Sequence, residues 1–179
     1  PSMEIGFHSK IQDRVVYHTH PIYLNVILCA KNSKSIISEI LNFYEYDYIE
    51  YFSPGKDLCD NFYKSTDKKI VLLENHGLIC CGDSFNEVFD TSLKISQLCK
   101  EWLITHAKTF KTFNTKLSTN NTNCVLFPDA AVLPDDNSQI NNYILHIQEE
   151  VGLVGNCLSK KEINKLRDME SEKYRIKLA

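Results

Sequence analysis

Two short segments, residues 69–74 and 78–81, constrain the fold more than any other feature of the sequence, because their apolar runs at 70–73 and 78–81 show no alternation. A strand with one face in water alternates apolar and polar residues, whereas a strand covered on both faces is apolar throughout. The runs therefore predict strands buried inside a sheet, interrupted at residues 75–77. Further strands are predicted at residues 14–18 and 48–52, which are rich in strand-forming residues.

Helices are predicted between and after these strands. The clearest begins at Ser84, which forms a capping box with Glu87 ahead of apolar residues at helical spacing. Pro21 suits the first turn of a helix that runs to about Ala30. Further helices are expected at residues 4–12, 35–41, 58–63 and 140–151, and from a second capping box at residues 159–162. Alternating strands and helices predict an α/β fold, a three-layer α/β/α domain.

The chain has 179 residues, a length that suits one domain with its own core. We expect residues 1–106 to form this core and residues 107–179 to form a C-terminal helical extension. Within the extension, the polar residues 111–123 predict a connector and residues 125–127 a strand. Because the chain begins at Pro1 without an initiator methionine, its N-terminal part is expected to be missing.

Charge and cysteine content narrow the class of partner and the compartment. The net charge is −3 and the basic residues are scattered, so no nucleic acid or membrane surface is expected as a partner. Seven cysteines, an odd number without CxxC pairs, predict free and mostly buried thiols in a reducing cytoplasm. A small-molecule partner is the default expectation.

Three histidines suggest a metal site. His18 and His20 stand two positions apart, so on an extended chain their side chains leave the same face. His76 sits where an apolar strand breaks before a glycine. Three histidines with one open position form the coordination of a catalytic zinc ion. Taken singly, each motif also fits a structural histidine or a simple turn.

Four landmarks occur in order along the chain: residues 1–8, the His18-Thr19-His20-Pro21 segment, residues 51–58 and residues 72–82. Their order and spacing resemble the class II aldolase/adducin family, whose best-known enzymes are the fuculose and rhamnulose phosphate aldolases. The resemblance covers about residues 1–106. It implies a mainly antiparallel central sheet, a sugar or sugar-phosphate substrate and a homotetramer.

The same resemblance assigns roles to individual residues. It implies that His18, His20 and His76 bind Zn²⁺. Glu4 corresponds to the catalytic acid/base, and Tyr51 to a tyrosine that reaches the neighbouring subunit's site and protonates the leaving carbonyl. The implied reaction is aldol cleavage of a small ketose or ketose phosphate through an enediolate, which needs a Lewis acid and a nearby proton carrier.

Other positions are predicted to bind the substrate or to take no part. Ser2, Asn75 and Gly77 are the expected substrate-binding residues. His8, like His106 and His146, is interpreted as an ordinary surface or core histidine. Acidic residues after Pro128, with Asp129 the first of them, are interpreted as a solvated turn.

Alternative functions remain open from the sequence. A sugar-phosphate epimerase or a dehydratase can use the same scaffold. A non-catalytic, adducin-like module would have lost the metal ligands, whereas all three histidines are present here. A truncated and inactive remnant is the remaining alternative.

Overall fold

A four-stranded sheet lies at the centre of the computed structural model, which describes residues 5–64, 67–108, 123–169 and 173. The strand order is β1-β4-β3-β2. The strands are β1 (Val15–Thr19), β2 (Asp47–Ile49), β3 (Ile70–Leu73) and β4 (Gly77–Gly82). β4 pairs antiparallel with both β1 and β3, and only β2 and β3 are parallel. The predicted α/β class and the mainly antiparallel sheet are thus confirmed.

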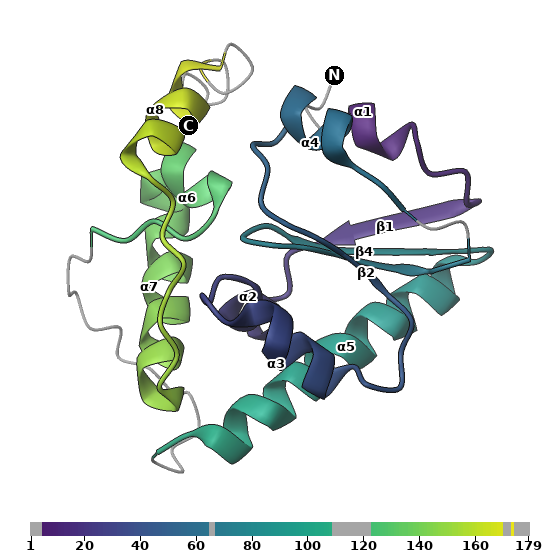
Figure 1. Ribbon diagram of the computed structural model, residues 1–179, viewed down its shortest axis with the longest axis horizontal. Coiled ribbons are helices and arrows are strands. Elements are labelled where there is room, and N and C mark those ends of the chain that lie inside the picture. Colours follow the sequence, from purple (N-terminus) through teal and green to yellow (C-terminus); the bar gives the residue numbers. More distant parts are fainter. Residues whose placement is uncertain (1–4, 65–66, 109–122, 170–172, 174–179) are drawn as a thin grey trace.

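Helices cover both faces of this sheet (Figure 1). One face carries α2 (Ile22–Leu28), α3 (Ser33–Ile40) and α5 (Phe85–His106), and the other carries α1 (Ile5–His8) and α4 (Lys56–Asn61). The C-terminal helices α6 (Pro128–Val132), α7 (Pro134–Val151) and α8 (Lys160–Asp168) form a further group beside the sheet. The prediction of a three-layer α/β/α domain is thus confirmed.

No helix in the described part of the chain is both long and apolar enough to cross a membrane.

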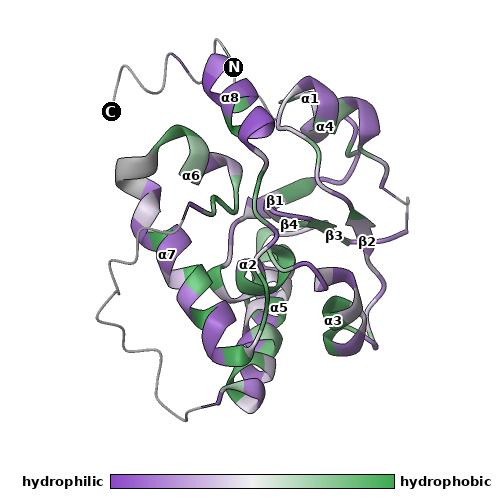
Figure 2. Cartoon of the chain, turned by 60° about the vertical axis from the view of Figure 1, so that its left-hand side comes forward, coloured by the Kyte–Doolittle hydropathy of each residue, from purple (hydrophilic) through white to green (hydrophobic). Residues whose placement is uncertain are grey.

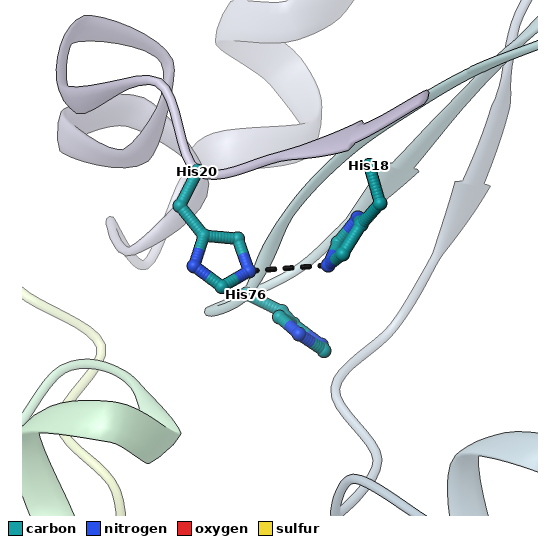
Figure 3. A group of neighbouring side chains, drawn as sticks. All are labelled: His18, His20 and His76. Atoms are coloured by element: carbon teal, nitrogen blue, oxygen red, sulfur yellow. Dashed lines mark hydrogen bonds between the residues drawn. The ribbon is translucent and has the colours of Figure 1, made fainter. Parts of the chain in front are cut away.

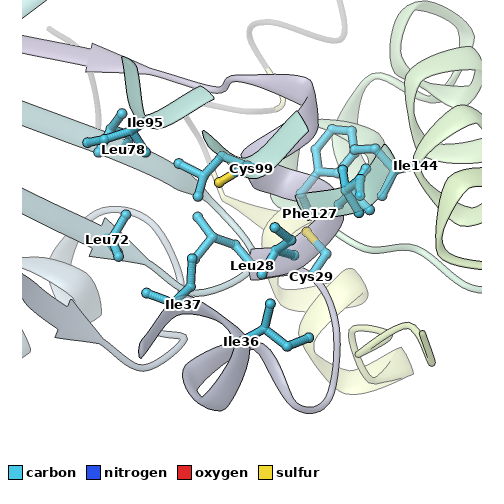
Figure 4. Packing of buried hydrophobic residues seen from close by; sticks show 14 of the residues in the cluster. Leu28, Cys29, Ile36, Ile37, Leu72, Leu78, Ile95, Cys99, Phe127 and Ile144 are labelled. Carbon is cyan, nitrogen blue, oxygen red and sulfur yellow. The ribbon is translucent and has the colours of Figure 1, made fainter. Parts of the chain in front are cut away.

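The two apolar runs are buried strands, as predicted. Every residue of β3 and β4 is buried, and alternate residues join two different hydrophobic clusters. Leu72 and Leu78 pack with Leu28 of α2 and Ile95 of α5 (Figure 4). On the opposite face, the second cluster includes Leu58 of α4 and contains Phe62, Val71, Leu73, Ile79 and Cys81 as well. Each fully buried side chain of this size contributes about 1.5–3 kcal/mol to folding.

The helix α2 is hydrophobic along most of its length (Figure 2), and residues 24–28 are all buried. It contacts α5, α7 and β4, so it lies between the sheet and the C-terminal helices. A central helix of this kind can hold neighbouring turns in place through its own polar groups.

The predicted strand at residues 125–127 is wrong. The Asn141 side chain accepts a hydrogen bond from the Leu126 N–H and donates one to the Cys124 carbonyl, both at 2.9 Å. These bonds satisfy the backbone without a neighbouring strand. The strand expected at residues 48–52 is also shorter, since β2 ends at Ile49. The connector predicted at residues 111–123 lies almost wholly outside the described residues.

The expectation that all cysteines are free is wrong at one pair. Cys124 and Cys157 form a disulfide, with their Cα atoms 5.1 Å apart, although 33 positions separate them in the sequence. The loop after α7 folds back beside the segment before α6, where the Leu158 N–H donates to the Val125 carbonyl at 2.7 Å. The other five cysteines are free, and four of these are buried.

Candidate metal centre

The three histidines converge at one end of the β1–β4 pair (Figure 3). His18 lies in β1, His20 follows one residue after that strand ends, and His76 stands just before β4. The ring centroids are 4.9 Å apart for His18 and His20, and 5.1 Å apart for each of these with His76. One ring nitrogen from each residue lies within 4.8 Å of the other two, so the three histidines can hold a metal ion.

The hydrogen bonds of His18 suit a ligand. Its Nδ1 lies 3.0 Å from the Leu78 carbonyl oxygen, so a proton on Nδ1 is donated there and Nε2 keeps its lone pair. That Nε2 is 3.1 Å from Nε2 of His20. Two nitrogens on a tetrahedral zinc ion, with bonds of about 2.0–2.1 Å, would be about 3.3 Å apart. The residues present therefore fit a metal with nitrogen ligands.

Helix α2 holds the turn that carries His76. His76 is 5% exposed, and its carbonyl accepts a hydrogen bond from the Asn25 side chain at 3.2 Å. The preceding residue, Asn75, has φ of 53°, a left-handed conformation that asparagine tolerates better than most residues. Its N–H donates to the Leu28 carbonyl at 3.2 Å. Both contacts fix the backbone on either side of the His76 side chain.

Gly77 is required by close packing around His20. A Cβ atom added at Gly77 would lie 2.5 Å from the Thr19 carbonyl oxygen and 2.6 Å from Cδ2 of His20. Any other residue would displace the backbone of β1 or rotate the imidazole. Gly77 was predicted to contact substrate, and that contact stays a prediction. The structure shows that Gly77 makes room for a candidate ligand.

The Asn75 side chain connects the turn that carries His76 to the C-terminal segment. It is buried, and its amide donates to the carbonyls of Leu126 at 2.6 Å and Asn156 at 2.7 Å. Its oxygen accepts from the Asn156 amide at 3.0 Å. These hydrogen bonds are made inside the protein, so they give no support to the predicted substrate contact of Asn75. They give Asn75 a structural role, and its substrate contact stays a prediction.

Ser2 and Glu4 lie outside the described residues, but His8 lies beside the site. Its ring stands edge-on to that of His18, with centroids 5.9 Å apart. The interpretation of His8 as an ordinary histidine therefore missed a neighbour of the metal centre. Its sequence position, four residues after Glu4, was the available signal.

Tyr51 contacts the C-terminal helix of its own chain. Its N–H donates to the Glu74 carboxylate at 3.0 Å, and its hydroxyl donates to Glu162 of α8 at 3.1 Å. The Ser53 hydroxyl donates to the same Glu162 oxygen. Burial, together with the negative charge of Glu162, raises the pKa of Tyr51 well above its usual range. The hydroxyl therefore stays protonated and available as a donor.

Both predicted capping serines accept the expected backbone N–H, Ser84 from Glu87 and Ser159 from Glu162. The Glu87 carboxylate accepts in return from the N–H of Asp83, next to the cap. At the second cap the Glu162 carboxylate is directed to Tyr51 instead. Glu162 thus takes part in the cap of α8 through its backbone N–H, and its side chain links α8 to Tyr51.

Asp129 also lies at the site, although it was interpreted as part of a solvated turn. Its carboxylate oxygen is 3.8 Å from Nδ1 of His20. Asp129 belongs to α6, in the C-terminal extension. No local sequence pattern indicates that it lies near His20, which follows β1. Sequence reasoning therefore missed it.

Residues 1–103 match the family described as the Class II Aldolase and Adducin N-terminal domain, which is more than half of the chain. The chain belongs to this family. All three histidines of this class II aldolase-like domain fall within the matched residues. Asp129 and Glu162 lie beyond them.

Individual relatives are distant. The uncharacterized oxidoreductase YuxG of Bacillus subtilis (strain 168) is 27% identical over 107 residues, which cover 58% of this chain and 15% of that protein. A solved N-terminal class II aldolase domain of a conserved protein from Thermoplasma acidophilum is 24% identical, with a TM-score of 0.48. That match covers 57% of this chain and 48% of the solved chain. The chain thus spans only a small part of its curated relative's length.

Proposed function

We propose that this chain is the zinc-binding part of an aldolase, a lyase that cleaves or forms a small ketose or ketose phosphate. The observation that carries the proposal is the convergence of His18, His20 and His76, whose ligand atoms lie within 4.8 Å of one another. Three histidines with an open position is the coordination used by catalytic zinc. Membership of the class II aldolase family supports the same reaction type.

The residues of the site have separate proposed roles in metal binding and proton transfer. When bound, zinc would supply a Lewis acid for two adjacent substrate oxygens. The three histidines hold it, with His76 fixed through its backbone by Asn25. Glu4 transfers the proton during cleavage and its reverse. Support for Glu4 comes from His8, four positions later in the chain, which lies beside His18.

A substrate panel tests this proposal. Zinc-loaded protein supplied with ketose 1-phosphates is expected to release an aldehyde and dihydroxyacetone phosphate. The activity should disappear with a chelator and return with zinc. An isomeric ketose phosphate as the product would indicate an epimerase, and loss of water a dehydratase. Equal cleavage by metal-free protein would contradict the proposed role of the histidines.

We also propose a homotetramer in which Tyr51 acts at the neighbouring subunit's site. An apolar stripe on α5 offers surface that an assembly would bury, because Phe85, Phe89 and Leu93 are 55%, 36% and 53% exposed. The hydrogen bond between the Tyr51 hydroxyl and Glu162 would have to be exchanged for one to substrate. Burial and Glu162 raise the pKa of Tyr51, which keeps the hydroxyl protonated but makes it a weaker acid, so proton donation would require its release from Glu162.

The change Tyr51→Phe is expected to lower turnover while leaving zinc content and assembly intact. Loss of the hydrogen bond to the Glu162 carboxylate should cost about 1.5–3 kcal/mol of stability. Mixing the Tyr51→Phe and Glu4→Gln proteins should restore part of the activity, since exchanged tetramers contain sites with both native residues. Subunit exchange and mass are followed by native mass spectrometry. An active monomer, or no recovery despite exchange, would leave Tyr51 with its contact to α8 alone.

A small molecule remains the proposed partner, rather than a nucleic acid or a membrane. We also propose a cytoplasmic location, because five of the seven cysteines are free. The disulfide between Cys124 and Cys157 argues against a reducing compartment, where such bonds are rare.

A further inference from the structure

We propose that Asp129 is a positioning residue of the metal centre, whose carboxylate orients His20 from outside the ligand set. The C-terminal segment, beyond the residues matched by the family, would then help to build the site. This inference rests on the proposed metal-binding function of the three histidines.

The two nitrogens of His20 face different groups. Nε2 lies 3.1 Å from Nε2 of His18, and Nδ1 lies 3.8 Å from Oδ2 of Asp129. The ligand atoms that lie within 4.8 Å of one another come from the three histidines, and the Asp129 carboxylate is not among them. Asp129 therefore lies near the nitrogen of His20 that is not paired with His18.

A carboxylate in this place determines which nitrogen can bind a metal. The carboxylate favours a proton on Nδ1 of His20. The Nε2 lone pair is then left for the metal ion, and Nε2 becomes a stronger electron-pair donor to it. His18 has the same arrangement, with the Leu78 carbonyl 3.0 Å from its Nδ1. A contact of 3.8 Å becomes a hydrogen bond through a small rotation of the side chain or through one bridging water.

The backbone around Asp129 is held firmly. It lies in α6, which begins after the buried Phe127, and the Leu133 N–H donates to the Asp129 carbonyl at 2.8 Å. Just before this helix, the Leu126 carbonyl accepts from the Asn75 side chain, next to His76. The segment that carries Asp129 is thus attached to the turn that carries another ligand. This fixed placement is what a positioning residue requires.

Zinc affinity tests the proposal, measured by competition with a chromophoric chelator and Zn²⁺ alone as the probe. Asp129→Ala is expected to bind zinc about 10- to 100-fold more weakly than the unchanged protein, the usual effect of removing such a partner. Asp129→Glu should recover part of the loss. The control Asp90→Asn removes an exposed carboxylate from α5 and should bind zinc like the unchanged protein.

A second readout separates orientation from general structure. In the zinc-loaded protein, the Nδ1 proton of His20 should give a slowly exchanging NMR signal that Asp129→Ala loses. Unchanged affinity in a folded Asp129→Ala protein, or weaker affinity with the proton signal retained, would overturn the proposal. If Asp129→Ala fails to fold, Asp129→Leu, which keeps a similar side-chain shape but has no acceptor oxygen, is judged by the same two measurements. An unchanged protein that binds no zinc would overturn the metal site itself, whereas equal binding by both proteins would overturn only the role of Asp129.

Discussion

His76→Ala is expected to lose most of the zinc that the unchanged protein binds in near-stoichiometric amount. Removing His76 leaves only His18 and His20 from the candidate ligand set. No other histidine, cysteine or carboxylate in the described part of the chain belongs to that set. Metal analysis after gel filtration measures the change, and zinc-dependent activity should fall with it.

The fold should survive this substitution, so the metal loss can be interpreted. The hydrogen bond from Asn25 reaches the backbone carbonyl of His76, which alanine keeps. Thermal unfolding of the metal-free proteins should therefore show a modest difference. His106→Ala removes an exposed histidine that stacks on Trp102, and it serves as the matched control. If His76→Ala keeps its zinc, the ligand assignment is wrong.

Glu4→Gln is expected to lower turnover about 100-fold or more while leaving the zinc content nearly unchanged. The substitution keeps the size and the oxygen of the side chain but removes its ability to carry a proton. The expected pattern thus separates proton transfer from metal capture. Turnover on an accepted substrate and metal content are measured on the same preparation.

The control for Glu4→Gln is Glu149→Gln, which neutralises an exposed glutamate of α7. It should leave both turnover and zinc unchanged. Unaltered turnover of the Glu4→Gln protein would remove Glu4 from the mechanism. Loss of zinc together with activity would instead indicate that Glu4 is a metal ligand.

The sequence by itself determined the elements whose signals are local. Unbroken apolar runs predicted β3 and β4, because a strand buried on both faces can carry no polar alternation. Ser84 and Ser159 predicted the starts of α5 and α8, because a serine before a helix can accept one of the backbone N–H groups that the first turn leaves unpaired. The spacing of His18 and His20 likewise predicted that their side chains point to the same side, since side chains two positions apart on an extended chain leave the same face.

Only the tertiary structure decided how the C-terminal segment meets the site. Glu162 reaches Tyr51 across 111 positions, and Asn156 reaches Asn75 across 81. Asp129 approaches His20 in the same way, from α6. No periodicity or cap encodes such pairs, because each depends on how α6, α7 and α8 pack against α2 and the sheet. That packing is set by apolar surface from many distant residues together, which a local pattern does not contain.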